Sequence, residues 1–218
     1  MLKIFISCQK YFGDIVLSEL IRNKGVSVVG VSCPLDDKRV AKTAYLHNIP
    51  IIEAGTLNYN TMPPGVDLGI AAHSFDYVGK RTRYKTKFGW IGYHPSLLPR
   101  HRGRSAIEWA IKMKDFATGG TVFWLNAGID RGDILKQRFI FIDPKLYGLD
   151  SKVAARKLWQ NELQDIGVDL INQAVEEIQK GVFNKTPQDS RFSTFEPSTD
   201  VKDIFKPDLL MLEENNKI

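Results

Sequence analysis

The sequence of 218 residues has only two cysteines, no long hydrophobic run and none of the glycine-rich motifs that bind phosphates. Its longest apolar runs, such as VSVVGVSC, are far shorter than the roughly 20 residues that cross a bilayer, so we expect no membrane-spanning segment. Cys8 and Cys33 have no CxxC spacing and are interpreted as buried free thiols. The opening MLKIFISCQKYFG breaks its apolar run at Gln9 and Lys10, which speaks against a signal peptide and favours a cytoplasmic protein.

The turn after the first apolar run reads SCQKYFGD, which matches neither GxGxxG nor GxxxxGK[ST]. These glycines let a backbone approach phosphates closely, so their absence disfavours a dinucleotide site and a P-loop. The formal net charge of +5 is a mild bias toward anionic partners and a weak sign of nucleic-acid binding. We also expect no metal site, because no HxxxH spacing occurs among the four histidines, His47, His73, His94 and His101.

Short apolar runs alternate with amphipathic stretches, a pattern typical of an α/β protein with a mostly parallel sheet. Strands are predicted at residues 2–7, 26–33, 50–53, 67–72, 88–93, 120–125 and 134–142. Helices are predicted at 13–23, 37–47 and 106–113, with a long one within 151–179. We therefore predict one domain over residues 1–180, a twisted sheet with helices on both faces. Residues 181–218 are polar and proline-rich at their start and are interpreted as a C-terminal extension.

The stretch WIGYHPSLLPRHRG carries a histidine to the end of a predicted strand and then stiffens the chain around it. Side chains alternate between the faces of a strand, so Gly92 and His94 are expected to point the same way. Open α/β sheets bind ligands beyond the carboxyl ends of their strands, which makes His94 a candidate for chemistry. Pro95 and Pro99 fix φ and remove two backbone donors, so this loop can hold a reacting group still.

The helix after this loop is expected to begin at Ser105, with Glu108 three residues further on. This pattern predicts a capping box, in which each side chain satisfies a free backbone donor at the helix start. We expect both side chains to start the helix and to take no direct part in chemistry.

A second candidate segment, FWLNAGIDRGDIL, ends a predicted strand in a turn that presents Asp130 and Asp133. A carboxylate beside a histidine orders the imidazole and favours its charged form, and such a pair can move a proton at neutral pH. From the residues alone, His94 could pair with either aspartate. The alternative is that both aspartates only shape the turn.

The motif HPSLLPRHRG, followed 36 positions after its histidine (residue 94 to residue 130) by the aspartate of GIDRGDIL, resembles the formyltransferases that use 10-formyltetrahydrofolate. The resemblance covers roughly residues 2–179 and implies a formyltransferase catalytic domain with a Rossmann-like fold. It makes His94 and Asp130 two members of the family's catalytic trio. The third member, an asparagine, falls on Gly92, and in this the segment is most similar to the hydrolase domain of 10-formyltetrahydrofolate dehydrogenase.

The resemblance also implies 10-formyltetrahydrofolate as co-substrate, bound between the loop after the fourth strand and the turn before Asp130. It requires no metal and no covalent enzyme intermediate. Phe75 and Tyr77 could equally be core aromatics. The residues whose backbone groups are expected to pair with the pterin ring are Ser74, Phe75, Asp76, Tyr77, Leu125, Asn126, Ala127 and Gly128.

The implied reaction is direct attack of an amine on the formyl carbon, with charged His94 stabilising the oxyanion and Asp130 holding the imidazolium. We expect a small-molecule acceptor, such as an amino sugar nucleotide, because the features typical of the glycinamide ribonucleotide and methionyl-tRNA enzymes are not seen. Neither nucleic acid nor membrane is an expected partner, and a homodimer is left open. Because Gly92 lacks the family's amide, a hydrolase that releases formate is one alternative, and a folate-binding module without catalysis is another.

Overall fold

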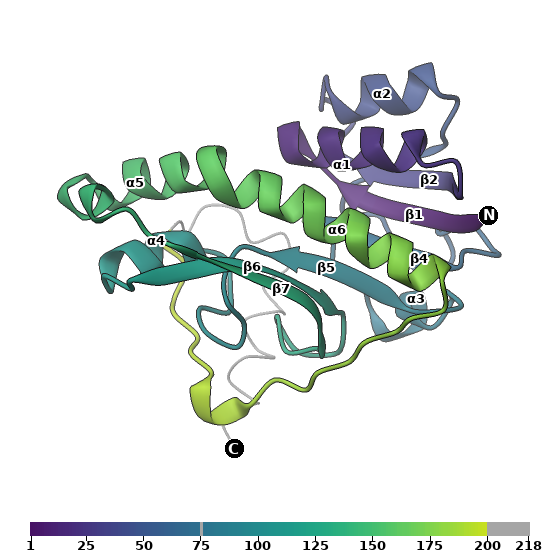
Figure 1. The fold of residues 1–218 in the computed structure, drawn as a ribbon. Coiled ribbons are helices and arrows are strands. Elements are labelled where there is room, and N and C mark those ends of the chain that lie inside the picture. Colours follow the sequence, from purple (N-terminus) through teal and green to yellow (C-terminus); the bar gives the residue numbers. More distant parts are fainter. Residues whose placement is uncertain (75, 200–218) are drawn as a thin grey trace. The chain divides into compact units, whose positions relative to one another are not determined.

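The computed structural model describes residues 1–74 and 76–199, and its strands form a seven-stranded sheet in the order β3-β2-β1-β4-β5-β6-β7 (Figure 1). The pairs of β1 with β2 and β4, of β2 with β3 and of β4 with β5 are parallel, whereas β6 and β7 are antiparallel. The predicted α/β class with a mostly parallel sheet is confirmed. The strands are β1 (Leu2–Cys8), β2 (Val26–Cys33), β3 (Ile51–Glu53), β4 (Leu68–Ala72), β5 (Trp90–His94), β6 (Ala117–Trp124) and β7 (Ile134–Phe141).

The predicted helices are also present, and one short α-helix was missed, as were the 3₁₀-helices Pro144–Gly148 and Ser190–Phe192. The long helical run contains a π-helical turn, Trp159–Leu163, that separates its two α-helical parts. The missed α-helix has the sequence KRTR, which is too short and too polar to show an apolar period. The helices are α1 (Lys10–Arg22), α2 (Val40–Leu46), α3 (Lys80–Arg83), α4 (Ala106–Lys112), α5 (Ser151–Leu158) and α6 (Gln164–Gln179).

The chain divides into two compact units. Unit 1 comprises Met1–Gly92 and Val175–Val182, and unit 2 comprises Tyr93–Ala174 together with the residues that follow Val182. In unit 1, β1 lies between β2 and β4, and its Ile4, Phe5 and Ile6 are fully buried. Strands of a parallel sheet are covered on both faces, which explains why they read as continuous apolar runs.

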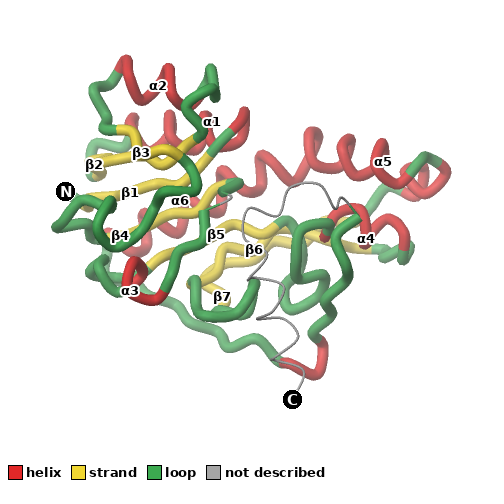
Figure 2. Tube along the Cα trace, turned by 180° about the vertical axis from the view of Figure 1, so that it is seen from behind, coloured by secondary structure: helices red, strands yellow, loops and turns green. Residues whose placement is uncertain are grey.

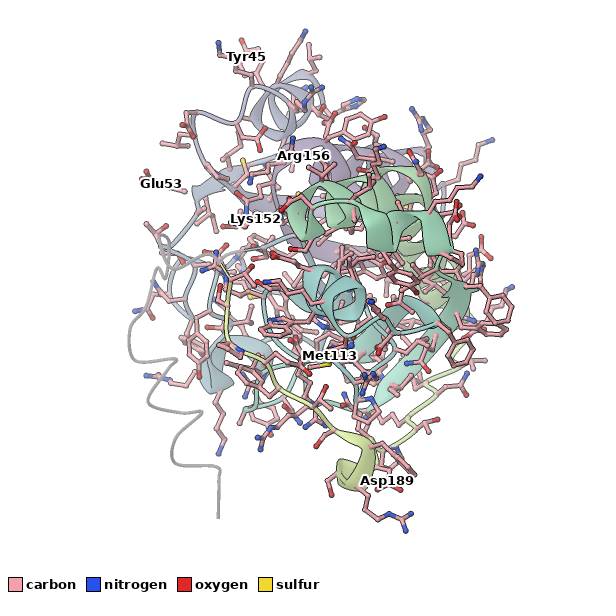
Figure 3. All side chains as sticks on the ribbon, turned by 90° about the vertical axis from the view of Figure 1, so that its left-hand side faces the viewer. Tyr45, Glu53, Met113, Lys152, Arg156 and Asp189 are labelled. Atoms are coloured by element: carbon pink, nitrogen blue, oxygen red, sulfur yellow. The ribbon has the colours of Figure 1, made fainter. Side chains whose placement is uncertain are left out.

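The helices of unit 1 are amphipathic, as their sequences predict. In α2, Val40 and Ala44 are buried four residues apart, whereas Tyr45 is 80% exposed and projects away from the ribbon (Figure 3). Cys8 and Cys33 are buried free thiols, as predicted, and burial raises the pKa of Cys33 to about 11. Both thiols are therefore held in the protonated, unreactive form at neutral pH. Within residues 1–74 and 76–199, no helix is long and apolar enough to span a membrane.

Unit 2 is built around the antiparallel pair of β6 and β7. The Tyr93 hydroxyl donates to the carbonyl of Leu163 in the π-helical turn (2.6 Å) and fixes the end of β5 to the long helical run. After α6 the chain continues as a long loop with one short helical turn, Ser190–Phe192 (Figure 2). The Asp189 carboxylate caps the start of this turn by accepting the Arg191 N–H. We call residues 183–199 the tail.

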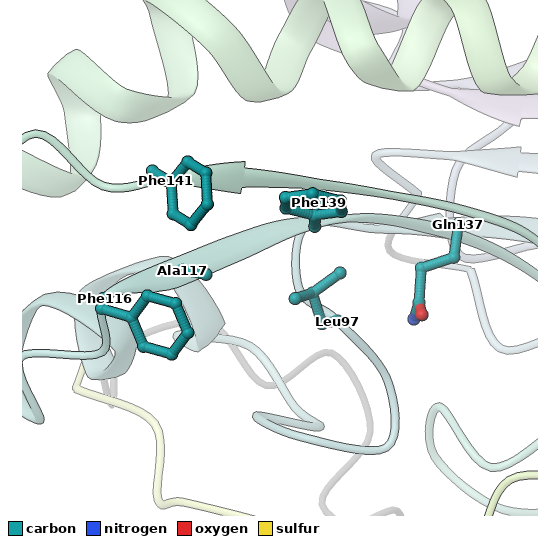
Figure 4. A pocket seen from close by; sticks show the side chains of 6 residues that line it. All are labelled: Leu97, Phe116, Ala117, Gln137, Phe139 and Phe141. Atoms are coloured by element: carbon teal, nitrogen blue, oxygen red, sulfur yellow. The ribbon is translucent and has the colours of Figure 1, made fainter.

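One face of β7 is open and apolar. Phe139 and Phe141 are two residues apart on this strand, so they lie on the same face, and they are 62% and 70% exposed. Together with Phe116, which is 75% exposed, they form part of a groove of about 540 Å³ (Figure 4). The other residues that line this groove are Leu97, Ala117 and Gln137.

The capping box predicted for α4 is wrong. Ser105 is the N-cap residue but makes no capping hydrogen bond, and its hydroxyl instead accepts the Thr199 N–H (3.0 Å). The Glu108 carboxylate accepts from the hydroxyls of Thr199 (2.6 Å) and Ser151 (2.9 Å) and pairs with Lys112 (2.9 Å). These side chains connect α4 to the tail and to α5, and Thr199 and Ser151 lie too far along the sequence for a local motif to reveal them.

The turn between β6 and β7 depends on Gly132. A Cβ atom at this position would lie 1.5 Å from the Trp124 carbonyl oxygen. We expect Gly132→Ala to lower the free energy of unfolding by about 3 kcal/mol, the upper range for overpacking, because backbone must move to admit the methyl group. Denaturant unfolding measures this loss. The matched control is Gly148→Ala, where no atom lies within 4 Å of the added Cβ, and equal stabilities of the two variants would contradict the close approach.

The fold should become less stable as the pH is lowered, because of His73, the residue after β4. Burial and, secondarily, the charge of Lys10 lower the pKa of His73 from 6.5 to about 4. Between these two values the unfolded chain binds more protons than the folded one, so acidification costs about 1.4 kcal/mol per pH unit. The loss amounts to about 3 kcal/mol in total, and the full stability is present above pH 6.5.

Denaturant midpoints measured between pH 6.5 and pH 4 test this prediction. His73 has φ 57°, a conformation that asparagine tolerates, so His73→Asn removes the titrating group without a new backbone conflict. We expect a flatter pH dependence in His73→Asn and an unchanged one in the control His47→Asn, which replaces an exposed histidine. The same slope in all three proteins would show that His73 is not responsible.

Candidate active site

His94 is the last residue of β5, and the residue as a whole is almost completely buried, at 6% exposure. The loop that follows the strand turns back, so that the backbone carbonyl of His101 lies 2.7 Å from His94 Nε2. A carbonyl oxygen can only accept, so Nε2 carries a proton and donates it. The hydrogen bond therefore fixes the tautomer and the orientation of the ring and leaves Nδ1 as the nitrogen that can gain or lose a proton.

Asp130 faces this second nitrogen. Its Oδ2 lies 3.5 Å from His94 Nδ1 and accepts the backbone N–H of Gly103 (2.8 Å). Asp130 adopts φ 51°, a left-handed conformation that aspartate tolerates better than most residues. Asp133, the other aspartate of the motif, contributes its backbone carbonyl to the N–H of Trp124 (2.8 Å). Of the two candidates, Asp130 is the one that pairs with His94.

The pair has the chemistry of an acid–base site. Its two side chains are only 8% and 19% exposed, so their electrostatic interaction is weakly screened by solvent. A proton on Nδ1 makes an imidazolium whose charge the carboxylate stabilises. The separation of 3.5 Å is too long for a short hydrogen bond, so this proton remains available to another acceptor, such as a developing oxyanion.

The structure adds Gln188 and Arg102, which sequence reasoning missed. Gln188 Nε2 donates to the carbonyls of Asp130 (2.8 Å) and Gly132 (2.7 Å) and so holds the turn that carries the carboxylate. Arg102 in turn donates to Gln188 Oε1 from Nε (3.1 Å) and Nη2 (2.7 Å). Burial, and then the charge of Arg131, lowers the pKa of Arg102. No local signal could have found Gln188, because it lies in the polar segment that reads as an extension.

The predicted pterin-binding residues fall in both units. Ser74, Asp76 and Tyr77 follow β4 in unit 1, and Phe75 lies outside the described residues. The Asp76 carboxylate accepts three hydrogen bonds, from the hydroxyls of Ser7 (2.6 Å) and Ser32 (2.5 Å) and from the N–H of Gly55 (2.6 Å). This side chain therefore joins the ends of β1 and β2 to the turn after β3.

The second predicted segment, residues 125–128, follows β6 in unit 2. Asn126 and Ala127 are exposed, and the Asn126 side chain accepts the N–H of Gly128 (2.9 Å) to shape the turn. Here too a side chain, that of Asn126, serves the local fold. Among the residues that the structure describes, no three His, Cys, Asp or Glu side chains are grouped in a way that could hold a metal ion.

Comparison with known proteins supports the resemblance seen in the sequence. Residues 2–164 match the family described as formyl transferase. The mitochondrial 10-formyltetrahydrofolate dehydrogenase of Mus musculus is 32% identical over 211 residues, which cover 89% of this chain and 22% of the mouse protein. The chain thus spans about a fifth of the length of the dehydrogenases that it matches.

Solved structures share the fold. The N-formyltransferase of Helicobacter canadensis, in complex with folinic acid and dTDP-3-aminofucose, has a TM-score of 0.71 at 20% identity, covering 93% of this chain and 73% of that one. A 4-N formyltransferase from Francisella tularensis has a TM-score of 0.72 at 21% identity, covering 96% and 85% of the two chains. The family match over most of the sequence and the dehydrogenase relative together show that this chain belongs to the formyl transferase family.

Proposed function

We propose that this chain transfers the formyl group of 10-formyltetrahydrofolate to an amine, with His94 and Asp130 as the catalytic residues. The observation that carries the proposal is the imidazole whose Nε2 is fixed by a backbone carbonyl and whose Nδ1 faces a carboxylate. Membership of the formyl transferase family and a fold shared with a folinic acid complex support it. The pterin ring is proposed to pair with backbone groups of residues 74–77 and 125–128.

In this mechanism the acceptor nitrogen attacks the formyl carbon, and the carbonyl oxygen gains the negative charge of a tetrahedral intermediate. The proton on His94 Nδ1 stabilises that oxygen, and Asp130 stabilises the imidazolium. The bond from the carbon to N10 of the folate then breaks. N10 receives the proton that the acceptor nitrogen gives up, passed by Asp130 through water. The products are a formamide and tetrahydrofolate, and no oxidant or reductant is needed.

The acceptor is proposed to be a small-molecule amine, with an amino sugar nucleotide as the first candidate to test. The Helicobacter canadensis structure, which contains dTDP-3-aminofucose, motivates this choice. The second candidate function is hydrolysis to formate. It is favoured by Gly92, which provides no side-chain amide for the oxyanion, and by the likeness to 10-formyltetrahydrofolate dehydrogenases.

The domain boundaries, the cellular location and the partners of the protein are also proposed. Residues 1–180 are assigned as the catalytic domain and residues 181–218 as its extension. The protein is proposed to be cytoplasmic, with neither nucleic acid nor membrane as a partner. A homodimer is left open, and light scattering at several protein concentrations would decide it.

Incubation with 10-formyltetrahydrofolate, with and without amino sugar nucleotides, tests the function. We expect tetrahydrofolate and a formamide only when an amine is present. Formate without any amine would establish the hydrolase instead, and binding without turnover would establish a folate-binding module.

Substitutions test the two catalytic residues. His94→Ala and Asp130→Asn should each lower the rate of formyl transfer by about 10²- to 10⁴-fold while folate binding persists, because they remove proton transfer and charge stabilisation. Asp133→Asn is the matched control in the same turn and should retain the wild-type rate. Rates near wild type in His94→Ala and Asp130→Asn would refute the assignment.

Gly92→Asn tests whether the absent amide limits the rate. One oxyanion donor is worth about 10²- to 10³-fold, so we expect a faster reaction if the amide reaches the formyl oxygen. Gly92→Ala adds bulk without a donor and should bring no gain. An equal loss of rate in both variants would show that position 92 has no room for a side chain, and the missing amide would then not explain the rate.

A further inference from the structure

The orientation of His94 depends on the position of one peptide group, the carbonyl of His101. The backbone at this group is strained, because His101 has φ 54°, whereas Gly103, two residues on, adopts φ 97° at no cost because it has no Cβ. A left-handed conformation costs a non-glycine residue about 1 kcal/mol and persists where surrounding contacts determine it. The contacts that hold His101 therefore act on His94 as well.

The His101 side chain is 2% exposed and lies between two carboxylates. Its Nε2 is 2.7 Å from Asp115 Oδ2, and its Nδ1 is 3.1 Å from Glu196 Oε2, although this second contact lacks the angle of a hydrogen bond. Arg100 adds two hydrogen bonds to Asp115, from Nε (2.7 Å) and Nη2 (2.6 Å). Burial alone would raise the pKa of Asp115, but the hydrogen bonds from Arg100 and His101 outweigh it and hold this pKa below its ordinary value.

The tail holds the backbone of the same loop. The hydroxyl of Thr194 accepts the His101 N–H (2.8 Å), and its carbonyl accepts the Arg102 N–H (3.1 Å). The N–H of Thr194 donates to the carbonyl of Pro99 (3.2 Å). One residue of the tail thus makes three hydrogen bonds to three residues of the loop, Pro99, His101 and Arg102, and Glu196, two residues on, contacts the His101 ring.

The tail also reaches the other member of the pair through Gln188, which donates to the carbonyl of Asp130. Residues 188–196 therefore contact both the peptide that orients His94 and the turn that carries Asp130. Arg102 connects these two contacts directly, because it belongs to the loop and donates a hydrogen bond to Gln188.

We propose that His101, Thr194 and Glu196 are positioning residues for formyl transfer: they fix the carbonyl of His101 and through it the tautomer and orientation of His94. This inference rests on the proposed function. It predicts that the tail affects the chemical step without touching the reacting atoms.

The test compares two threonines of the tail. Thr194→Val removes the acceptor of the His101 N–H and keeps the size of the side chain. Thr199→Val is the matched control, because its hydroxyl contacts Ser105 and Glu108 at the start of α4 and not the loop. Glu196→Gln is the third variant and removes the charge beside His101. Circular dichroism and denaturant unfolding establish that each variant is folded.

Two readouts separate positioning from a general loss of structure. In Thr194→Val and Glu196→Gln we expect kcat to fall about 10- to 100-fold with little change in the KM for the folate, since misplacing a catalytic group by about 1 Å costs up to about 10²-fold. Nitrogen-15 NMR of labelled histidine at alkaline pH, with the His94 signal assigned from His94→Ala, should show the Nε2–H tautomer in the wild type. The same spectra should show a mixture of tautomers in both variants. Thr199→Val should match the wild type in both readouts.

The outcomes distinguish this inference from the proposed function. A wild-type kcat and an unchanged His94 spectrum in Thr194→Val and Glu196→Gln, with His94→Ala inactive, would overturn the positioning role and leave the proposed function standing. An altered His94 spectrum in the two variants, together with no turnover of 10-formyltetrahydrofolate by the wild type, would support the positioning of His94 and overturn the proposed function.

Discussion

A single hydrogen bond, from His94 Nε2 to the carbonyl of His101, decides which nitrogen of the imidazole meets Asp130. The acceptor is a backbone group, so it cannot change its protonation state or rotate away. Many histidine sites use a carboxylate for this purpose, whereas here the peptide orients the ring and the carboxylate of Asp130 is left to interact with the other nitrogen. The arrangement separates the task of orientation from the task of holding charge.

Both members of the pair depend on a residue in the left-handed conformation, which residues other than glycine adopt uncommonly. Asp130 has φ 51° and the peptide that supports His94 belongs to a residue with φ 54°. Thr194 accepts a hydrogen bond from the His101 N–H and Gln188 donates one to the Asp130 carbonyl, and these bonds hold the two conformations in place. The buried contacts of His101 with Asp115 and Glu196 add to them. The conformation of the site is thus held by the tail, a segment that has almost no regular secondary structure.

The sequence predicted those features whose causes are local. All the strands and the principal helices could be located, because apolar periodicity reflects burial of each element on its own. His94 and Asp130 could be identified from motifs at a fixed spacing. The capping box failed because Ser105 and Glu108 bond to Thr199, more than ninety residues further along the chain. Gln188 and Thr194 were missed for the same reason: a polar residue in an irregular segment gains its role only from tertiary contacts.

The course of the tail has a practical consequence for protein engineering. A chimera that borrowed this scaffold up to the end of α6 would retain His94, Asp130 and every strand. It would nevertheless lack Gln188, Thr194 and Glu196, and with them the hydrogen bonds of Gln188 and Thr194 and the contact of Glu196 with His101 that support the geometry of the pair. A chimera that is meant to keep the site must therefore include the tail as far as Glu196 and cannot end at α6.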